Sequence, residues 1–113
     1  MLRLKAGIYV NALVRRIFAV GSAAFVARHG DDDAGGIFIR VNRLDGHSGL
    51  LTQFSGMEGE AGWRVLATPQ TPDSEVDALL QREINRDPDL WVVEIEDKAG
   101  RHFLEEKIMG DWE

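Results

Sequence analysis

Hydrophobic residues recur at two different spacings along the chain, and the spacing predicts which segments are helices. Between residues 6 and 20 they repeat every three or four positions and Gly21 follows, which is typical of an amphipathic helix that ends at a glycine. A second run of this kind covers residues 72–86, where Thr71 is a suitable N-cap and a proline holds the first helical position. Two helices are therefore predicted, although the β-prone cluster Ile8-Tyr9-Val10 leaves a strand over residues 2–10 as an alternative.

Shorter apolar segments bounded by Gly, Asp and Asn predict the strands. They are expected at residues 22–29, 37–44, 47–54, 63–67, 90–97 and 101–106. Asp45-Gly46 suits a two-residue hairpin turn that would place Val41 opposite Leu50. A three-residue turn over residues 98–100, with glycine in the left-handed position, would place Glu96 opposite His102.

The predicted element order is α-β-β-β-β-α-β-β, which belongs to the α+β class. We expect a single antiparallel sheet of five or six strands with two helices on one face. The chain has 113 residues, enough for one domain over residues 1–113 with a modest core. It has no cysteine, which excludes disulfides and a cysteine nucleophile and fits a cytoplasmic location. No apolar run approaches the roughly 18 residues of a membrane span, so no membrane association is expected.

Charge is unevenly distributed along the chain. The net charge is −6, which argues against nucleic-acid binding by the molecule as a whole. The first 30 residues nevertheless carry five basic residues and no acid, whereas residues 71–113 carry thirteen acids and five basic residues. Pairing between the two ends of the chain explains this pattern most simply, and a basic docking surface is the alternative.

The second predicted hairpin supplies the first candidate site. His102 would face Glu96 across the strand pair, with Glu94 one step along and Glu106 as a further neighbour. An imidazole beside two carboxylates can bind a divalent cation or act as a general base. Opposite charges across a strand pair also stabilise sheets without any further function, and we favour this structural interpretation.

Two further groups of polar residues are candidates. Asp31, Asp32 and Asp33, flanked by glycines, could bind a cation, but the spacing of an EF-hand is absent and a solvated loop is favoured. Arg40, Asn42 and Gln53 would share the polar face of the first hairpin and could bind an anionic group. That face also carries Phe38 and Leu51, which indicates partial cover by a helix or a partner chain, and Trp112 near the C-terminus is a candidate interface residue.

Several blocks of the sequence together resemble a known family. They are Arg3-Leu4-Lys5, Arg28–Gly35, Val41–Gly46 and Asp87–Asp97. The family consists of small uncharacterised alphaproteobacterial proteins, classed as a domain of unknown function. The resemblance implies a bacterial, cytoplasmic, single-domain protein, and it brings no activity, cofactor or catalytic residue with it.

The leading functional hypothesis is a non-enzymatic interaction or adaptor module that forms a homodimer or binds a protein partner. Its basis is the absence of nucleophile and zinc motifs together with apolar residues on the outer strand faces. One alternative is a metal-assisted hydrolase or ligand-binding domain that uses His102 with Glu94 and Glu96. Another is a nucleic-acid regulator that docks through the basic first helix. No cofactor or resident metal is expected.

Overall fold

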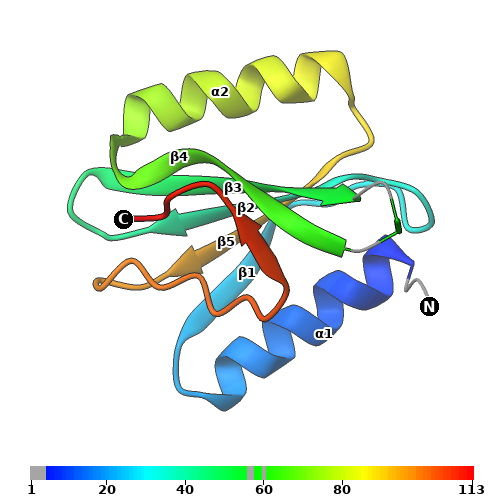
Figure 1. Ribbon diagram of the computed structural model, residues 1–113, viewed down its shortest axis with the longest axis horizontal. Coiled ribbons are helices and arrows are strands. Elements are labelled where there is room, and N and C mark those ends of the chain that lie inside the picture. Colours follow the sequence, from blue (N-terminus) through cyan, green and yellow to red (C-terminus); the bar gives the residue numbers. More distant parts are fainter. Residues whose placement is uncertain (1–4, 56–57, 60) are drawn as a thin grey trace.

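The computed structural model describes residues 5–55, 58–59 and 61–113, and its elements occur in the predicted order (Figure 1). They are α1 (Ala6–Ala19), β1 (Ala23–Arg28), β2 (Ile37–Asn42), β3 (His47–Ser55), β4 (Ala61–Pro72), α2 (Asp73–Arg86), β5 (Trp91–Glu96) and β6 (Lys107–Met109). The α+β class, the element order and the two helices are thus confirmed, and the sheet has six strands. The strand alternative for residues 6–10 is wrong, and residues 2–4 lie outside the described residues.

The six strands form one mixed sheet in the order β1-β5-β2-β3-β4-β6. Three neighbouring pairs are antiparallel, as predicted, but β2 with β5 and β4 with β6 run parallel. A parallel pair requires a long crossover between its strands, and the chain supplies one by returning through α2 to insert β5 between β1 and β2.

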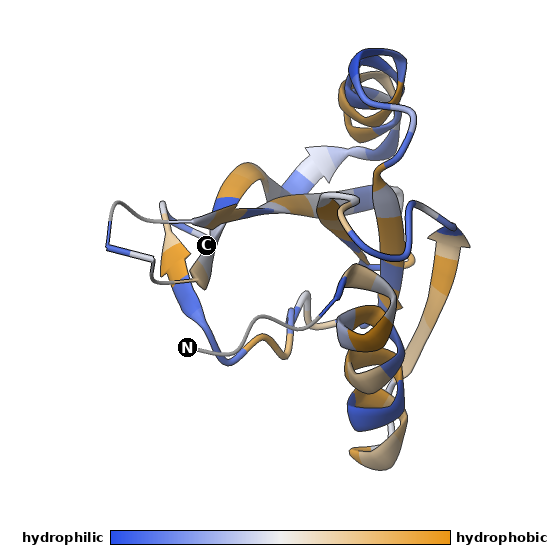
Figure 2. Cartoon of the chain, turned by 90° about the vertical axis from the view of Figure 1, so that its right-hand side faces the viewer, coloured by the Kyte–Doolittle hydropathy of each residue, from blue (hydrophilic) through white to orange (hydrophobic). Residues whose placement is uncertain are grey.

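The two helices cover opposite faces of the sheet, which corrects the prediction that they share one face. In Figure 1, α2 lies above the sheet and α1 below it. The α1 face buries Ile39, Val93 and Ile95, whereas the α2 face buries Phe38 and Val92. Central strands that are covered on both faces become continuously apolar, which explains why Phe38 broke the predicted alternation. Both helices are amphipathic, with hydrophobic residues concentrated along one side (Figure 2).

The first hairpin is shifted by one residue from its predicted register. Val41 pairs with Gly49 rather than with Leu50, because the turn contains three residues instead of two. The Arg43 amide donates a hydrogen bond to the His47 carbonyl at 3.1 Å, and Leu44 takes a positive φ of 65° between them. A shift of one residue exchanges the faces of the strand, so Leu51 packs under α1 and Leu50 under α2.

The second predicted hairpin does not form. β5 already has a neighbour on each side, since Glu96 lies opposite Ala23 of β1 and opposite Asn42 of β2. Residues 101–106 therefore have no edge of β5 to pair with, and the return strand predicted there is wrong. The glycine turn is present at Gly100, with a φ of 75°, but the chain then continues to the far edge of the sheet and pairs with β4 as β6.

The C-terminal segment docks through Trp112. Its indole nitrogen donates a hydrogen bond to the Gly100 carbonyl at 2.7 Å. Its ring lies on Gly49 of β3, where an added Cβ atom would stand 2.3 Å from the ring. A glycine is needed at this position because the ring approaches the backbone so closely. Trp112 is therefore half-buried against its own chain.

Candidate functional site

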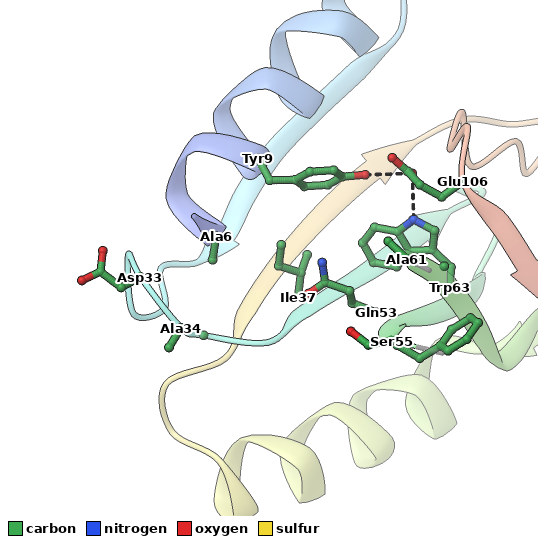
Figure 3. Close-up of a pocket in the computed structure, with 13 residues that line it drawn as sticks. Ala6, Tyr9, Asp33, Ala34, Ile37, Gln53, Ser55, Ala61, Trp63 and Glu106 are labelled. Atoms are coloured by element: carbon green, nitrogen blue, oxygen red, sulfur yellow. Dashed lines mark hydrogen bonds between the residues drawn. The ribbon is translucent and has the colours of Figure 1, made fainter. Parts of the chain in front are cut away.

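A pocket of about 450 Å³ opens on the α1 face of the sheet (Figure 3). Five segments line it: the first turns of α1, the loop before β2 together with the first residue of β2, the end of β3, the start of β4, and Glu106 immediately before β6. Its wall residues include Tyr9, Gln53, Phe54, Trp63 and Glu106. These segments are far apart in the sequence, so the pocket is a product of the tertiary fold.

The Glu106 carboxylate is held in the pocket wall by two neutral donors. The Tyr9 hydroxyl and the Trp63 indole N–H each donate a hydrogen bond to Glu106 Oε1 at 3.0 Å. Figure 3 shows both side chains directed toward this carboxylate from α1 and β4. The Tyr9 and Trp63 rings are themselves in tilted contact, with centroids 6.0 Å apart. The carboxylate thus links α1, β4 and the segment before β6.

The local environment shifts the pKa values of Tyr9 and Glu106 in opposite directions. Burial alone would raise the pKa of the Glu106 carboxyl, but hydrogen bonds from Trp63 and Tyr9, together with the charge of Arg16, lower it below its ordinary value. Burial raises the pKa of the Tyr9 hydroxyl, and the negative charge of Glu106 raises it further. At neutral pH the pair therefore consists of a fixed negative charge and a neutral donor.

The rest of the lining is apolar or uncharged, apart from Asp33. Gly62 leaves room for the Phe54 ring, since an added Cβ atom would stand 2.5 Å from that ring. Gln53 contributes an amide, and Ala34 forms an exposed part of the rim. Asp33 points away from Glu106 in Figure 3 and pairs with Lys5 at 3.4 Å. Glu106 is therefore the charged group that faces the pocket.

The predicted set of His102, Glu94 and Glu96 is not brought together by cross-strand pairing. His102 lies in the loop after Gly100, where its Nδ1 accepts the Leu104 amide at 2.9 Å and its ring contacts Trp112 edge-on at 5.5 Å. Burial lowers the pKa of the His102 imidazole. Glu94 lies in β5 and accepts a hydrogen bond from the Asn42 side chain at 3.2 Å. His102 is not paired with β5 because β1 and β2 occupy both edges of that strand.

The three aspartates of the loop before β2 have separate structural roles. The Asp31 carboxylate accepts the amides of Asp33 and Ala34 at 3.1 and 2.8 Å, which closes an Asx turn. The Asp32 carbonyl accepts the Gly7 amide at 3.1 Å and so satisfies a donor in the first turn of α1. Within the described ranges, no group of three or more Asp, Glu or His side chains is arranged to hold a metal ion.

The predicted binding face of Arg40, Asn42 and Gln53 is divided between the two sides of the sheet. Arg40 lies on the α2 side, where it pairs with Asp77 at 2.5 Å and with Asp73 at 3.3 Å. Gln53 pairs with Trp63 of β4 and lines the pocket on the α1 side. The division follows from the shifted register of the first hairpin.

Sequence reasoning missed the pairing of Tyr9 and Trp63 with Glu106. The predicted helix over residues 6–20 contains Tyr9 and the predicted strand over residues 63–67 contains Trp63, and the structure confirms both, while Glu106 is predicted only as a neighbour of His102. The available signal was the polar tip of each aromatic residue, because a buried hydroxyl or indole N–H usually finds an acceptor. Nothing in the sequence identified Glu106 as that acceptor.

In the part of the chain that the structure describes, no helix has the length and apolar character that crossing a membrane requires.

No curated protein sequence shows significant similarity to the chain. Several solved structures do resemble it. A crystal structure of a DUF1491 family protein from Caulobacter crescentus CB15 is 39% identical, with a TM-score of 0.83, and the match covers 94% of this chain and 99% of that one.

An NMR structure of a DUF1491 family protein from the same organism is 39% identical, with a TM-score of 0.82 and coverage of 97% and 100%. The solution structure of protein Atu0922 from A. tumefaciens is 38% identical, with a TM-score of 0.73 and coverage of 84% and 86%. The family model described as a protein of unknown function, DUF1491, matches residues 4–105. The alphaproteobacterial resemblance noted in the sequence is thus confirmed, and the chain belongs to the DUF1491 family.

Proposed function

We propose that this protein is a non-enzymatic binding module whose pocket takes a small organic ligand. The observation that carries the proposal is the ionised Glu106 carboxylate, held by Tyr9 and Trp63 in the wall of a pocket of about 450 Å³. Pockets that bind small molecules typically measure roughly 300–1,000 Å³ and combine apolar walls with a few fixed polar groups. This pocket has the size and the lining of that class.

The protonation behaviour of the pocket favours binding over catalysis. A general acid or base works best when its pKa lies near the working pH. The pKa of Glu106 is lowered and that of Tyr9 is raised, so both move away from neutrality. Such a pair is suited to orienting a ligand rather than to transferring a proton.

A fragment screen by two-dimensional ¹⁵N NMR tests this function. Hits should perturb the Trp63 indole signal and the amides of Tyr9 and Gln53, which lie around the pocket. Ala34→Phe should abolish these shifts, because residue 34 is exposed at the rim and a phenyl group there would fill the mouth. Ala78→Phe, on an exposed position of α2, is the matched control and should bind normally. Hits that map elsewhere, or none at all, would argue against a binding pocket.

We propose self-association through β1 as a second candidate function. β1 is an edge strand, and Phe25 on it is 43% exposed, close in sequence to exposed Phe18 and Val20 at the end of α1. It carries no lysine or proline, the residues that commonly protect an edge from pairing. Antiparallel pairing of two β1 strands would give a two-fold dimer and cover Phe25.

Light scattering across a concentration series tests this second function. The native chain should show a dimer that Phe25→Lys converts to a monomer, because charges on an edge strand oppose pairing. Leu66→Lys is a matched control in β4, where Leu66 is 38% exposed, and it should leave the dimer intact. A native chain that stays monomeric at all concentrations would refute self-association.

A further inference from the structure

The charged groups of the pocket are of one sign. Among its described lining residues, no lysine, arginine or histidine occurs, and the two charged residues are Asp33 and Glu106. Asp33 is directed away from the pocket centre and is paired with Lys5. Among the described lining residues, Glu106 is therefore the charged group that faces the interior.

Glu106 has its geometry fixed but its charge uncompensated. Tyr9 and Trp63 both donate to the same oxygen, Oε1, and both donors are neutral. A carboxylate offers about four acceptor positions on its two oxygens, so two bonds do not saturate it. Within the described part of the chain, no basic group lies within ion-pair distance of Glu106.

Arg16 is the basic residue that influences this carboxylate at longer range, and it is engaged elsewhere. Its guanidinium donates to the Phe103 carbonyl at 2.7 Å and lies 3.9 Å from the Glu105 carboxylate. It therefore anchors the segment before Glu106 without neutralising the Glu106 charge. A half-buried, ionised carboxylate with neutral donors on one oxygen can accept a cationic donor on its remaining positions.

The walls beside this carboxylate suit the apolar part of such a ligand. Tyr9 presents an aromatic ring, and Ile37 adds an aliphatic surface. Aromatic rings attract cations electrostatically, and they also accept flat apolar groups. An anionic ligand would meet the Glu106 charge in a partly water-excluded site, where repulsion is stronger than in bulk water.

From these contacts we infer that the pocket takes a small organic cation, an ammonium group on an apolar body, with the ammonium against Glu106 and the body against Tyr9 and Ile37. This inference rests on the proposed function of the pocket as a ligand site. Replacing the carboxylate by a neutral amide should weaken binding about tenfold, since hydrogen bonds to charged partners are roughly twice as strong as neutral ones.

The experiment compares three probes of similar shape: 2-phenylethylamine, 2-phenylethanol and phenylacetate. Each is titrated by NMR into the native chain, Glu106→Gln and Glu105→Gln. Glu106→Gln keeps an oxygen that Tyr9 and Trp63 can donate to, while Glu105→Gln makes the same charge change at an exposed neighbour. The amine should bind the native chain and Glu105→Gln equally, and Glu106→Gln about tenfold more weakly. The alcohol should bind the native chain about tenfold more weakly than the amine, and phenylacetate should not bind.

The outcomes separate this inference from the proposed function. If the alcohol binds the native chain as tightly as the amine, or if fragment hits in the pocket are neutral or anionic, the cation inference is wrong while the ligand site stands. If no probe and no fragment binds in the pocket, the ligand site itself is refuted. The comparison of probes on the native chain requires no substitution, so it remains decisive even if Glu106→Gln folds poorly.

Discussion

Tyr9→Phe removes one hydroxyl from the pocket wall and isolates its hydrogen bond to Glu106. The bond is 3.0 Å long and its acceptor is ionised. Hydrogen bonds to charged groups contribute roughly 1.5–3 kcal/mol of stability, and neutral ones roughly 0.5–1.5 kcal/mol. Both residues are half-buried, so water can replace part of the lost bond and the lower end of the first range applies. We therefore expect a loss of about 1.5 kcal/mol at pH 7, or about 6 °C in Tm for a chain of this size.

The cost of this substitution should depend on pH. The folded-state pKa of Glu106 is lowered, so its ionised form stabilises the fold fully above the unfolded-state pKa of roughly 4.3. That contribution is lost as the pH falls through the folded-state pKa. The difference between the native chain and Tyr9→Phe should consequently be greatest at pH 6–8. It should shrink toward roughly 0.5 kcal/mol, the lower end of the range for neutral bonds, as the pH falls through the folded-state pKa of Glu106.

Urea denaturation followed by circular dichroism measures these free energies in a double-mutant cycle. Tyr9→Phe, Glu106→Gln and the double variant should give a coupling energy of about 1 kcal/mol, while Tyr9→Phe combined with Glu105→Gln should be additive. Additive costs for Tyr9→Phe and Glu106→Gln, or a Tyr9→Phe cost that is equal at pH 7 and pH 3, would refute the assignment of Glu106 as a charged acceptor.

Three further predictions concern the rest of the molecule. Burial lowers the pKa of His102, so neutral His102 stabilises the fold above pH 6.5 and this stabilisation is lost as the pH falls. His102→Gln should therefore reduce the change in the urea midpoint between pH 7 and pH 5, and an unchanged pH dependence would contradict this prediction. Trp112→Ala removes the ring from Gly49 and should lower the free energy of unfolding by about 2 kcal/mol, roughly half the value for a fully buried tryptophan. Amide hydrogen exchange in β6 should become faster, and unchanged exchange would show that the C-terminal segment does not stabilise β6. Arg40→Met leaves Asp73 without its charged donor and should lower the free energy of unfolding, measured by urea denaturation, by about 2 kcal/mol. A loss below about 0.5 kcal/mol would show that the ion pair contributes no more than an exposed surface pair.

Local patterns predicted the individual elements closely. Helices expected at residues 6–20 and 72–86 are found at Ala6–Ala19 and Asp73–Arg86, because helical periodicity and end signals lie within a few neighbouring residues. The β5 strand, expected at residues 90–97, is found at Trp91–Glu96 for the same reason. These agreements concern the chain's own conformation, which neighbouring residues largely control.

Pairing between strands was harder to predict, because it depends on groups distant in sequence. The slip in the first hairpin arose at Leu44, whose positive φ is unusual for a leucine and is accompanied by a hydrogen bond from its amide to the Asn42 side chain. Hydrophobicity did not signal the slip, since Leu50 and Leu51 are both buried, one on each face. The predicted pairing of β5 with residues 101–106 is wrong because a glycine turn such as that at Gly100 does not require the segment after it to pair with the strand before it.

By itself the sequence determined the α+β class, the order of helices and strands and the family, because these depend on local spacing and on blocks of adjacent residues. Only the tertiary structure decided which faces the helices cover and which strands are neighbours. It also decided that Tyr9, Trp63 and Glu106 meet in one pocket wall, while His102 and Glu96 are not cross-strand partners. The physical reason is that each strand edge can be paired only once, and the insertion of β5 between β1 and β2 directed the C-terminal segment across the sheet to β4, where Glu106 meets α1.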